Sequence, residues 1–463
     1  MNVDINLKIL SFNRRFTLSK QGLQYGIGIF TVIVATVVAY WGSLPILVLF
    51  LAAMGMILTT LVFMRHIAVG YFLLLVGGMF IPFSGPGGIN AAMIILIFMA
   101  FLWLMNMLVV QRRFEFVRSG PIRPAVYFML MSVVAFGMGQ ISWFVFAKQA
   151  PLDTQLGGFA IYFFSFVALV MTANVLKDDR WLKAFVWLFI GLGAAYMVGR
   201  AAEFSFIDVI YQRGYIANSM FWTWMVAVAL GQVIFNHELS RRARAALFLV
   251  VALTLYIAVV LGNDWKSGWV PPLIAAGVLL ALRFKKLAIV AIPFALVAAK
   301  YLSQDLISSD QYSWGTRVDA WLVVLDISRI SPIFGLGFAN YYWFAKVFNI
   351  RGYHIQFSSH SQYVDIIAQT GLVGLVCFFW AAFEVTRLAW NLSQRAKDGF
   401  GRGYAHGVLA GLMGSLVAGF LVDWILPFAY NIGLQGFRAS ILPWIFFGGL
   451  ISLEQIHLKE ETS

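Results

Sequence analysis

The residues best suited to chemistry lie in one stretch, from Trp314 to Gly374, and its central positions are Arg317 and His360. Arginine stays protonated and can bind two oxygens of a phosphate group at once, whereas histidine exchanges a proton near neutral pH. A fixed positive charge and a titratable imidazole together suit a reaction in which a phosphate group departs. Most of the remaining chain is apolar, so this stretch is the largest place for such a reaction.

Two further basic residues stand beside aromatic residues at the ends of apolar runs. Arg213 precedes Asn218 by five positions, and Lys266 directly follows Trp265. Movement of a long side chain to the membrane surface explains any one such position. Three of them on one side, Arg213, Lys266 and Arg317, favour a shared anionic ligand, and we assign Lys266 and Asn218 to its binding.

A lipid diphosphate fits these groups. Arg213 and Arg317 would donate charge-assisted bonds to it, each contributing about 1.5–3 kcal/mol. Bonds that strengthen as the diphosphate departs would stabilise the transition state by about 3–4 kcal/mol per donor. His360, with an ordinary pKa of about 6.5, can take a proton from an incoming sugar hydroxyl. The alternative for His360 is a loop histidine bonded to the backbone.

Aromatic residues in the same stretch offer flat apolar faces. We assign Trp314, Tyr341 and Tyr342 to the binding of substrate, because such faces suit sugar rings. Anchoring at the membrane–water interface, where tryptophan and tyrosine gather, is the alternative.

Two structural features are expected here. Residues 317–330 should form an amphipathic helix along the membrane surface, with Leu322 and Leu325 on its apolar face and Pro332 at its end. Four glycines receive a structural role: Gly335, Gly337, Gly371 and Gly374. The first pair permits a tight turn, and the second pair permits the close approach of another helix.

The composition indicates an integral membrane protein. Hydrophobic residues make up 61% of the chain and charged residues 11%, against about 45–50% and about 25% in soluble proteins. The excess of apolar side chains has no interior to enter in water. The net charge of +13 is spread over short loops beside the apolar runs, which is typical of membrane topology and excludes a groove for nucleic acid.

The fold class expected is therefore all-α, a polytopic transmembrane bundle of about 12–14 spans, since each span needs about 20 apolar residues. We expect one integral membrane domain over 1–463, with an outer-face insert over 302–362 that carries short interfacial helices. The spans are centred near Phe30, Met54, Leu75, Phe98, Leu130, Phe166, Phe189, Val226, Tyr256, Ala275, Pro293, Phe378, Met413 and Ile445.

The distribution of basic residues predicts the orientation. With the amino terminus inside and alternating spans, 23 of the 33 lysines and arginines fall in inside loops, as the positive-inside rule requires. Both termini are then cytoplasmic. The stretch from Trp314 to Gly374 faces the opposite, periplasmic side.

Several other chemistries lack their residues. No Asp-x-Asp pair lies on the predicted outer side, and no Cys/His cluster has zinc spacing. A Gly-x-Ser-x-Gly elbow and a phosphate-binding glycine loop are also missing. Cys377 is the single cysteine, so a disulfide within the chain is excluded. We expect neither a metal nor a cofactor.

The order of the motifs resembles the bacterial O-antigen ligase and repeat-unit polymerase superfamily. The resemblance spans roughly residues 200–390, and its most specific part is the motif that begins at His360. The motifs are Arg213-Gly-x-x-x-Asn218, Gly315-x-Arg317 with Trp321, Pro332-x-x-Gly335-x-Gly337 and His360-Ser361-x9-Gly371-x-x-Gly374.

This resemblance implies a membrane glycosyltransferase of the GT-C type at the outer face of the bacterial inner membrane. Such enzymes move a glycan from undecaprenyl diphosphate to an acceptor hydroxyl, with inversion and without a metal. Arg213 and Arg317 would grip the diphosphate, and His360 would activate or orient the acceptor. Lys266 stands where relatives often have arginine, and it offers a point charge in place of a fork.

The acceptor stays open at this stage. Lipid A-core as acceptor makes the chain an O-antigen ligase of lipopolysaccharide biosynthesis, and a second lipid-linked repeat unit makes it a polymerase for O-antigen, capsule or exopolysaccharide. A rival of another class is a flippase for the same lipid-linked sugar, but transporters place ionisable residues at mid-span, where this chain has few. A non-catalytic partner in polysaccharide assembly or export is the third alternative.

Overall fold

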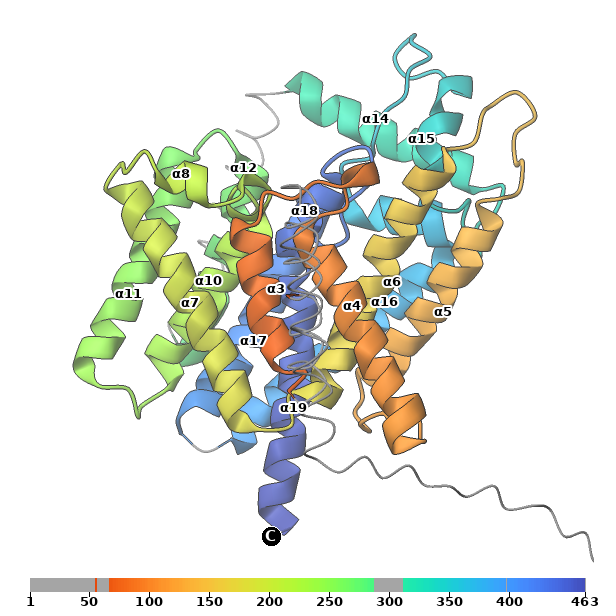
Figure 1. Ribbon diagram of the computed structural model, residues 1–463. Coiled ribbons are helices and arrows are strands. Elements are labelled where there is room, and N and C mark those ends of the chain that lie inside the picture. The colour runs from red at the N-terminus through yellow and green to blue at the C-terminus, as the bar shows by residue number, and fades with distance from the viewer. Residues whose placement is uncertain (1–54, 56–65, 287–310, 397, 463) are drawn as a thin grey trace, which may run out of the picture. The chain divides into compact units, whose positions relative to one another are not determined.

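The computed structural model describes residue 55 and residues 66–286, 311–396 and 398–462. Residues His66–Ser463 form one compact unit. This unit is a bundle of helices (Figure 1), and the residues described in it contain no β-strand. The predicted all-α class is therefore confirmed.

Long helices run through the bundle between its two ends. In chain order they are α3 (Val69–Phe80), α4 (Ala91–Met105), α5 (Ile122–Met138), α6 (Leu152–Val175), α7 (Asp179–Ala201), α10 (Ser219–Phe235), α11 (Arg241–Leu255), α12 (Lys266–Arg283), α16 (Gln362–Arg395), α17 (Phe400–Leu421) and α19 (Leu442–Thr462). Two of them continue as π-helical turns, α4 through η2 (Asn106–Gln111) and α11 through η3 (Tyr256–Leu261).

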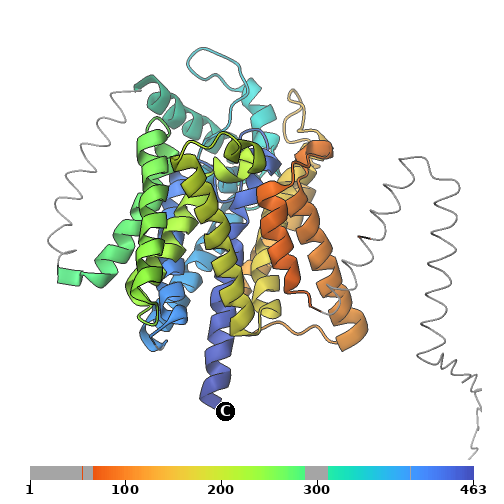
Figure 2. The same cartoon turned by 60° about the vertical axis from the view of Figure 1, so that its left-hand side comes forward.

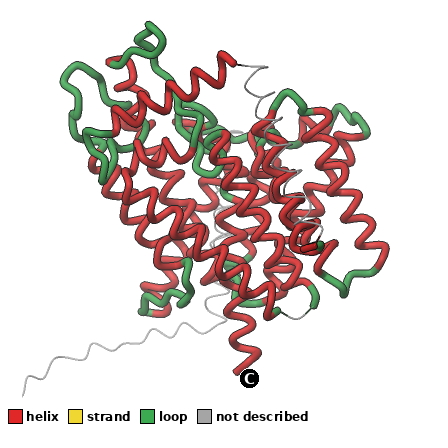
Figure 3. Tube along the Cα trace, turned by 180° about the vertical axis from the view of Figure 1, so that it is seen from behind, coloured by secondary structure: helices red, strands yellow, loops and turns green. Residues whose placement is uncertain are grey.

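Short elements gather at one end. They are η1 (Pro86–Gly88), α8 (Ile207–Ile210), α9 (Arg213–Ile216), α14 (Gln311–Ser328), α15 (Asn340–Phe344), η4 (Ala345–Val347) and α18 (Gly433–Ser440). Figure 3 shows most of the longer loops at this end too. We call it the loop-rich end.

Seven described helices are long and apolar enough to cross a membrane, and three shorter ones are apolar as well. The protein is thus a polytopic membrane protein. Three predicted span centres, at Phe30, Met54 and Pro293, lie outside the described residues, and the other centres all fall within helices.

Polar residues begin several of these helices by accepting the first unpaired backbone N–H groups. Asn90 accepts from Met93 N at 3.1 Å before α4, and Ser240 accepts from Ala243 N at 3.2 Å before α11. The apolar run that follows each cap continues as helix because every backbone group in a bilayer must be bonded within its own segment.

The centre of the bundle is packed tightly through small residues. α10 packs against α12 and α17, and α17 packs against α16. At the crossing of α10 and α17, a Cβ added to Gly231 would lie 2.6 Å from the carbonyl oxygen of Gly403. Helix backbones that lack side chains at the crossing approach closely, as is common in membrane bundles.

Arg438 in α18 is only 2% exposed. Its guanidinium donates to the carbonyl oxygens of Gly78, Ile81 and Phe83 at 3.3, 2.9 and 2.8 Å. These carbonyls lie at and just beyond the C-terminal end of α3, where a cation satisfies orphan acceptors. Arg438 therefore joins α18 to α3 and has a structural role.

The helix predicted over residues 317–330 corresponds to α14, and it lies across the loop-rich end (Figures 1 and 2). The sequence analysis did not predict which face of this helix packs against the bundle. Ala320, Val324 and Ile327 are buried against the bundle, whereas Leu322 and Leu325 are 62% and 37% exposed. Apolar residues occupy both faces of this helix, so the sequence pattern alone does not select the face that packs.

The α16 helix is interrupted at Gly371, whose φ is +69° and ψ −172°. Residues 332–337 occupy the interruption. Backbone N–H groups of Leu336 and Gly337 donate to Ala368 and Gln369, and those of Leu372 and Val373 donate to Pro332 and Ile333. These four hydrogen bonds satisfy backbone groups that the broken helix leaves unpaired, which is a requirement inside a membrane.

The glycines of this interruption leave room for backbone. A Cβ on Gly371 would lie 2.2 Å from Ile333 O, and one on Gly337 would lie 2.2 Å from Gly139 Cα. We expected Gly371 and Gly374 to admit another helix. Instead, Gly371 admits the 332–337 segment, and Gly374 leaves space for the side chain of Thr370.

Candidate functional site

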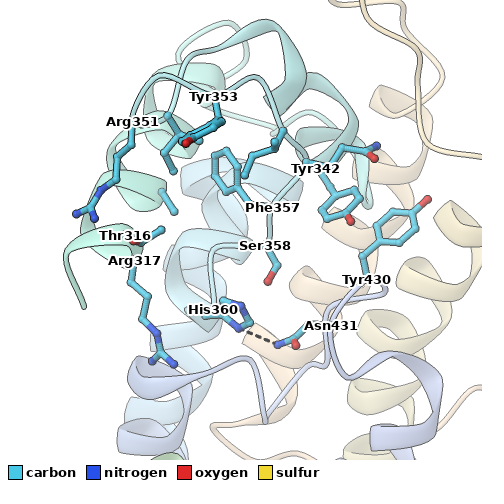
Figure 4. Close-up of a pocket in the computed structure, with 14 residues that line it drawn as sticks. Thr316, Arg317, Tyr342, Arg351, Tyr353, Phe357, Ser358, His360, Tyr430 and Asn431 are labelled. Carbon is cyan, nitrogen blue, oxygen red and sulfur yellow. Dashed lines mark hydrogen bonds between the residues drawn. The ribbon is translucent and has the colours of Figure 1, made fainter. Parts of the chain in front are cut away.

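A cavity of about 540 Å³ opens at the loop-rich end. Its walls come from three parts of the chain: α14 with the nearby Tyr342, the segment 350–360, and the segment 430–431. Figure 4 shows Arg317 and His360 next to each other in this cavity, with aromatic rings above them. Two of the three predicted catalytic residues thus share one cavity.

Arg317 enters the cavity from the first part of α14. Its Nη1 donates to the carbonyl oxygen of Leu421 at 3.2 Å. Leu421 is the last residue of α17, where carbonyl groups carry partial negative charge and bind cations. The end of α17 therefore fixes the guanidinium at one edge of the cavity.

His360 has a left-handed backbone conformation, with φ +49°. Such a conformation costs free energy and persists only where its surroundings impose it. Here the preceding residue, Ser359, is fully buried: its carbonyl accepts from Trp321 Nε1 at 2.7 Å, and its Oγ lies 2.7 Å from Asp365 Oδ1. Contacts from α14 and α16 thus hold the turn that presents the imidazole.

Tyr341 completes this support. Its ring is fully buried, its hydroxyl donates to Asp365 Oδ1 at 2.5 Å, and the hydroxyl oxygen accepts from Ser359 N at 3.2 Å. We expected Tyr341 to offer its ring to a sugar. In this structure the ring is out of reach of any ligand in the cavity, because Phe428 is stacked on it with ring centres 4.8 Å apart.

Burial lowers the pKa of His360 below its ordinary value, and the positive charge of Arg317 lowers it further. Both effects disfavour the imidazolium ion. His360 is therefore neutral at neutral pH.

Asn431 contacts His360 from the segment between α17 and α18, and Asp423 of the same segment contacts Asn431. Asn431 Nδ2 lies 3.3 Å from His360 Nδ1, and it also donates to Asp423 Oδ1. Asp423 is fully buried, and its Oδ2 accepts from Phe428 N at 2.5 Å. The sequence analysis missed both residues. A carboxylate directly after an apolar span, in Val422-Asp423-Trp424, was the available signal.

Arg351 is a second arginine of the cavity that the sequence analysis did not select. Its Nε donates to Asp319 Oδ2 at 2.6 Å, a half-exposed ion pair between the 350–360 segment and α14. A Cβ on Gly315 would lie 2.4 Å from Arg351 Nη2. The glycine of the Gly315-x-Arg317 motif therefore makes room for this guanidinium.

An aromatic wall borders the cavity. Tyr342 and Tyr430 stack with ring centres 4.3 Å apart and planes inclined by 18°. Trp343 Nε1 donates to the Tyr430 hydroxyl at 2.7 Å and fixes that ring. Tyr342 thus lines the cavity, and its contact with a substrate stays a prediction. Trp314 lies in α14, and its side chain is outside the described part of the structure.

Comparison with known families gives one match. Residues 224–379 match the family described as O-antigen ligase. The match confirms the resemblance to the O-antigen ligase and polymerase superfamily and supports a membrane glycosyltransferase. The search of curated proteins returns no match.

The O-antigen ligase segment contains Arg317, His360 and the interruption of α16 at Gly371. Arg213, Asp423 and Asn431 lie outside its bounds. The cavity is therefore built partly by the matched segment and partly by residues outside it. The 422–432 segment, which follows the matched segment in the chain, supplies the contact to the imidazole.

Arg213 lines a different hollow, of about 390 Å³, together with Trp265, Trp424 and Ile432. Trp424 and Ile432 belong to the same connecting segment as Asn431, which lines the first cavity. The 422–432 segment thus borders both. The structure joins Arg317 with His360 and places Arg213 in the adjoining hollow.

Asn218 and Lys266 begin helices beside that hollow. Asn218 is fully buried: its Oδ1 caps α10 by accepting from Met220 N at 2.9 Å, and its Nδ2 donates to Gly436 O at 3.2 Å. These bonds give Asn218 a structural role at the start of α10. Lys266 is the first residue of α12 and is half-buried.

Proposed function

We propose that this protein transfers a glycan from undecaprenyl diphosphate to an acceptor hydroxyl at the outer face of the bacterial inner membrane. The observation that carries the proposal is the common cavity of Arg317 and His360, walled by stacked aromatic rings. The match to the O-antigen ligase family supports it. Permanent positive charge, an imidazole and flat apolar rings are what a diphosphate, a hydroxyl and a sugar respectively require.

In this proposal, Arg317 binds the diphosphate and stabilises the charge that grows as the C1–O bond to phosphate breaks. Arg213 binds the same diphosphate from the adjoining hollow, which shares the 422–432 segment as its wall. His360 contacts the acceptor hydroxyl, whose oxygen forms the new bond to C1 while its proton passes to the departing diphosphate. Tyr342 and Tyr430 provide the surface for the sugar.

The proposed sidedness rests on the loops. The turns between α6 and α7, between α10 and α11 and between α16 and α17, which carry basic residues predicted to be cytoplasmic, lie at the end opposite the cavity. The cavity opens at the loop-rich end. The positive-inside rule then assigns the cavity to the periplasmic side.

The acceptor distinguishes a ligase from a polymerase, and we propose a ligase-like transfer to lipid A-core, with transfer to a second lipid-linked repeat unit as the alternative. Deletion in the host separates them. A polymerase mutant loses all chain length, whereas a ligase mutant retains polymer on the lipid carrier. Product analysis by gel electrophoresis and mass spectrometry reads out either result.

Reconstitution tests the proposal itself. Purified protein in proteoliposomes with a synthetic prenyl-diphosphate glycan and an acceptor should release prenyl diphosphate and form one glycosidic bond per turnover. Chelators should leave the rate unchanged, since the proposed roles fall to side chains. Movement of the lipid-linked glycan across the bilayer without a new bond would instead identify a flippase and reject the transferase.

A further inference from the structure

One nitrogen of the His360 ring forms a hydrogen bond with another side chain of the protein. Its Nδ1 lies 3.3 Å from Asn431 Nδ2 (Figure 4). The same Nδ2 donates to Asp423 Oδ1. The three side chains form a relay that runs from a buried carboxylate through an amide to the imidazole. The O-antigen ligase match does not cover Asn431 or Asp423.

The orientation of the amide follows from the carboxylate. An ionised carboxylate only accepts hydrogen bonds, so the Asn431 atom beside it must be the NH₂ group, which has two hydrogens. Turning the amide over would place its oxygen against Asp423 Oδ1, and two acceptors would then face each other. The second hydrogen of Nδ2 is directed to His360.

The tautomer of the imidazole follows from the amide. A nitrogen that accepts a hydrogen bond carries no proton, and a neutral imidazole carries its single proton on the other nitrogen. We propose that Asn431, held by Asp423, fixes His360 in the Nε2–H tautomer, so that His360 acts in the cavity as a hydrogen-bond donor and Asn431 is its positioning residue.

The donor has a defined use. Nε2 is on the edge of the ring away from Asn431, in a cavity that also holds the Arg317 guanidinium. An N–H group beside a fixed positive charge binds an oxygen with negative or developing negative charge. This assignment rests on the proposed function and adds to it the role of His360. The Nε2–H group binds and orients an oxygen of the diphosphate or of the acceptor, and the protonated Nε2 does not accept a proton.

The first experiment measures the tautomer and needs no substrate. Full-length protein labelled with ¹⁵N- and ¹³C-histidine is placed in lipid nanodiscs at pH 7.5. A difference spectrum against His360→Gln assigns this residue among the six histidines. Nitrogen and Cδ2 shifts of the Nε2–H form are expected. Shifts of the Nδ1–H form in the wild-type protein would overturn the proposal.

Substitution of Asn431 tests the cause. In Asn431→Asp a carboxylate replaces the donor, so the His360 signal should change to the Nδ1–H form; in Asn431→Ala it should become a mixture. Asn349→Asp is the matched control, because Asn349 lies in a different loop of the loop-rich end and its Oδ1 acceptor for Gly352 N is retained. An unchanged tautomer in both Asn431 variants would overturn the positioning role.

The second experiment separates donor from base by activity. Glutamine places an N–H group near the position of Nε2 but has no basic nitrogen. His360→Gln should therefore retain on the order of 10-fold more transfer activity than His360→Ala. His360→Asn, which tolerates the left-handed backbone, checks that the turn survives. Equal loss in the Gln and Ala variants, with equal thermal stability, would overturn the donor role.

The tautomer of His360 and the transfer activity together distinguish a failure of this inference from a failure of the proposed function. If the wild-type protein shows no glycosyl transfer in proteoliposomes but His360 is in the Nε2–H form and responds to Asn431→Asp, the proposed function fails while the relay stands. If transfer proceeds but the tautomer is Nδ1–H, the relay fails while the proposed function stands.

Discussion

Arg317 is held at the cavity in a geometry that lysine does not reproduce. Its Nη1 donates to Leu421 O, and this hydrogen bond sets the orientation of the planar guanidinium. We predict that Arg317→Lys lowers kcat/KM about 10-fold or more, because the charge stays but the bidentate contact is lost. A steady-state transfer assay in proteoliposomes measures the change.

Arg329→Lys is the matched control for this substitution. Arg329 follows the same helix, is paired with Asp326 at 3.1 Å, and is 83% exposed at its side chain. Its conversion should leave kcat/KM unchanged. Full activity of Arg317→Lys would reject the diphosphate-binding role of Arg317.

The acid limit of activity should depend on Asp423. Burial raises the pKa of Asp423 to about 6, although hydrogen bonds from Phe428 N and Asn431 act in the opposite direction. The ionised form, which accepts from Asn431, dominates above this pH and is lost as the pH falls through it. We predict that kcat falls below about pH 6, measured as a pH–rate profile.

The control for this prediction must account for the other titratable groups near Asp423. Asp365 interacts electrostatically with Asp423, Tyr341 and Tyr162 lie beside this pair, and His360 titrates below its ordinary pKa. In Asp423→Asn the carboxylate charge is absent at every pH, so kcat should be lower throughout, and of these two residues only His360 should shape the acid limb. An identical acid limb in wild type and Asp423→Asn would contradict the role of Asp423.

At the residue scale, motif order predicted Arg317 and His360 and failed to predict their supports. The His360 motif could be recognised from spacing along the chain, because Ser361 and Asp365 follow His360 directly, at the start of α16. Asn431 is 71 residues away, and only the return of the chain between α17 and α18 brings it to the imidazole. Tyr341 shows the opposite error, since its aromatic ring suggested a ligand contact and its hydroxyl serves Asp365.

The elements depend on glycines where backbone meets backbone. In Gly337→Ala, a methyl group must enter a left-handed conformation, with φ +83°, and lie 2.2 Å from Gly139 Cα. We predict a loss of about 3 kcal/mol in the free energy of unfolding, from the conformational cost and from overpacking. Thermal unfolding in detergent measures the loss.

Gly277→Ala supplies the control at the scale of helices. Gly277 lies inside α12, and its added Cβ would meet nothing within 4 Å. This substitution should raise stability by about 0.5–1 kcal/mol, because alanine loses less entropy in a helix. Equal stability of Gly337→Ala and the wild-type protein would show that residues 332–337 can leave the interruption of α16 without cost.

Hydropathy predicted the spans because long apolar runs have few other structures available in a membrane. It could not predict the interruption at Gly371, since the residues on both sides are as apolar as those of an unbroken span. It also missed the packed face of α14, which is selected by the shape of the bundle rather than by polarity.

For the whole molecule, the charge distribution predicts which end is cytoplasmic, and labelling can test it. Cys377 is the single cysteine and is buried, so it gives little background. In intact spheroplasts, a membrane-impermeant maleimide should label Asn349→Cys at the loop-rich end and spare Lys177→Cys at the opposite end. The reverse pattern would contradict the proposed orientation and the periplasmic cavity.

Composition alone decided the membrane class, because 61% hydrophobic residues exceed what a soluble core can bury. The charge of the loops supplied the orientation. The acceptor could not be predicted, since neither the spans nor the two central residues carry information about the sugar or hydroxyl that must fit the cavity.

The four backbone hydrogen bonds at the interruption of α16 have an evolutionary consequence. They join the residues just before the 338–367 segment to those just after it, so the two ends of this segment are held together. Adding residues at its exposed tip, Arg351–Gly352, would cost only the slowly growing entropy of a longer loop, about 0.6 kcal/mol for each doubling. The roof of the cavity can therefore be remodelled for new acceptors while the spans beneath it keep their register.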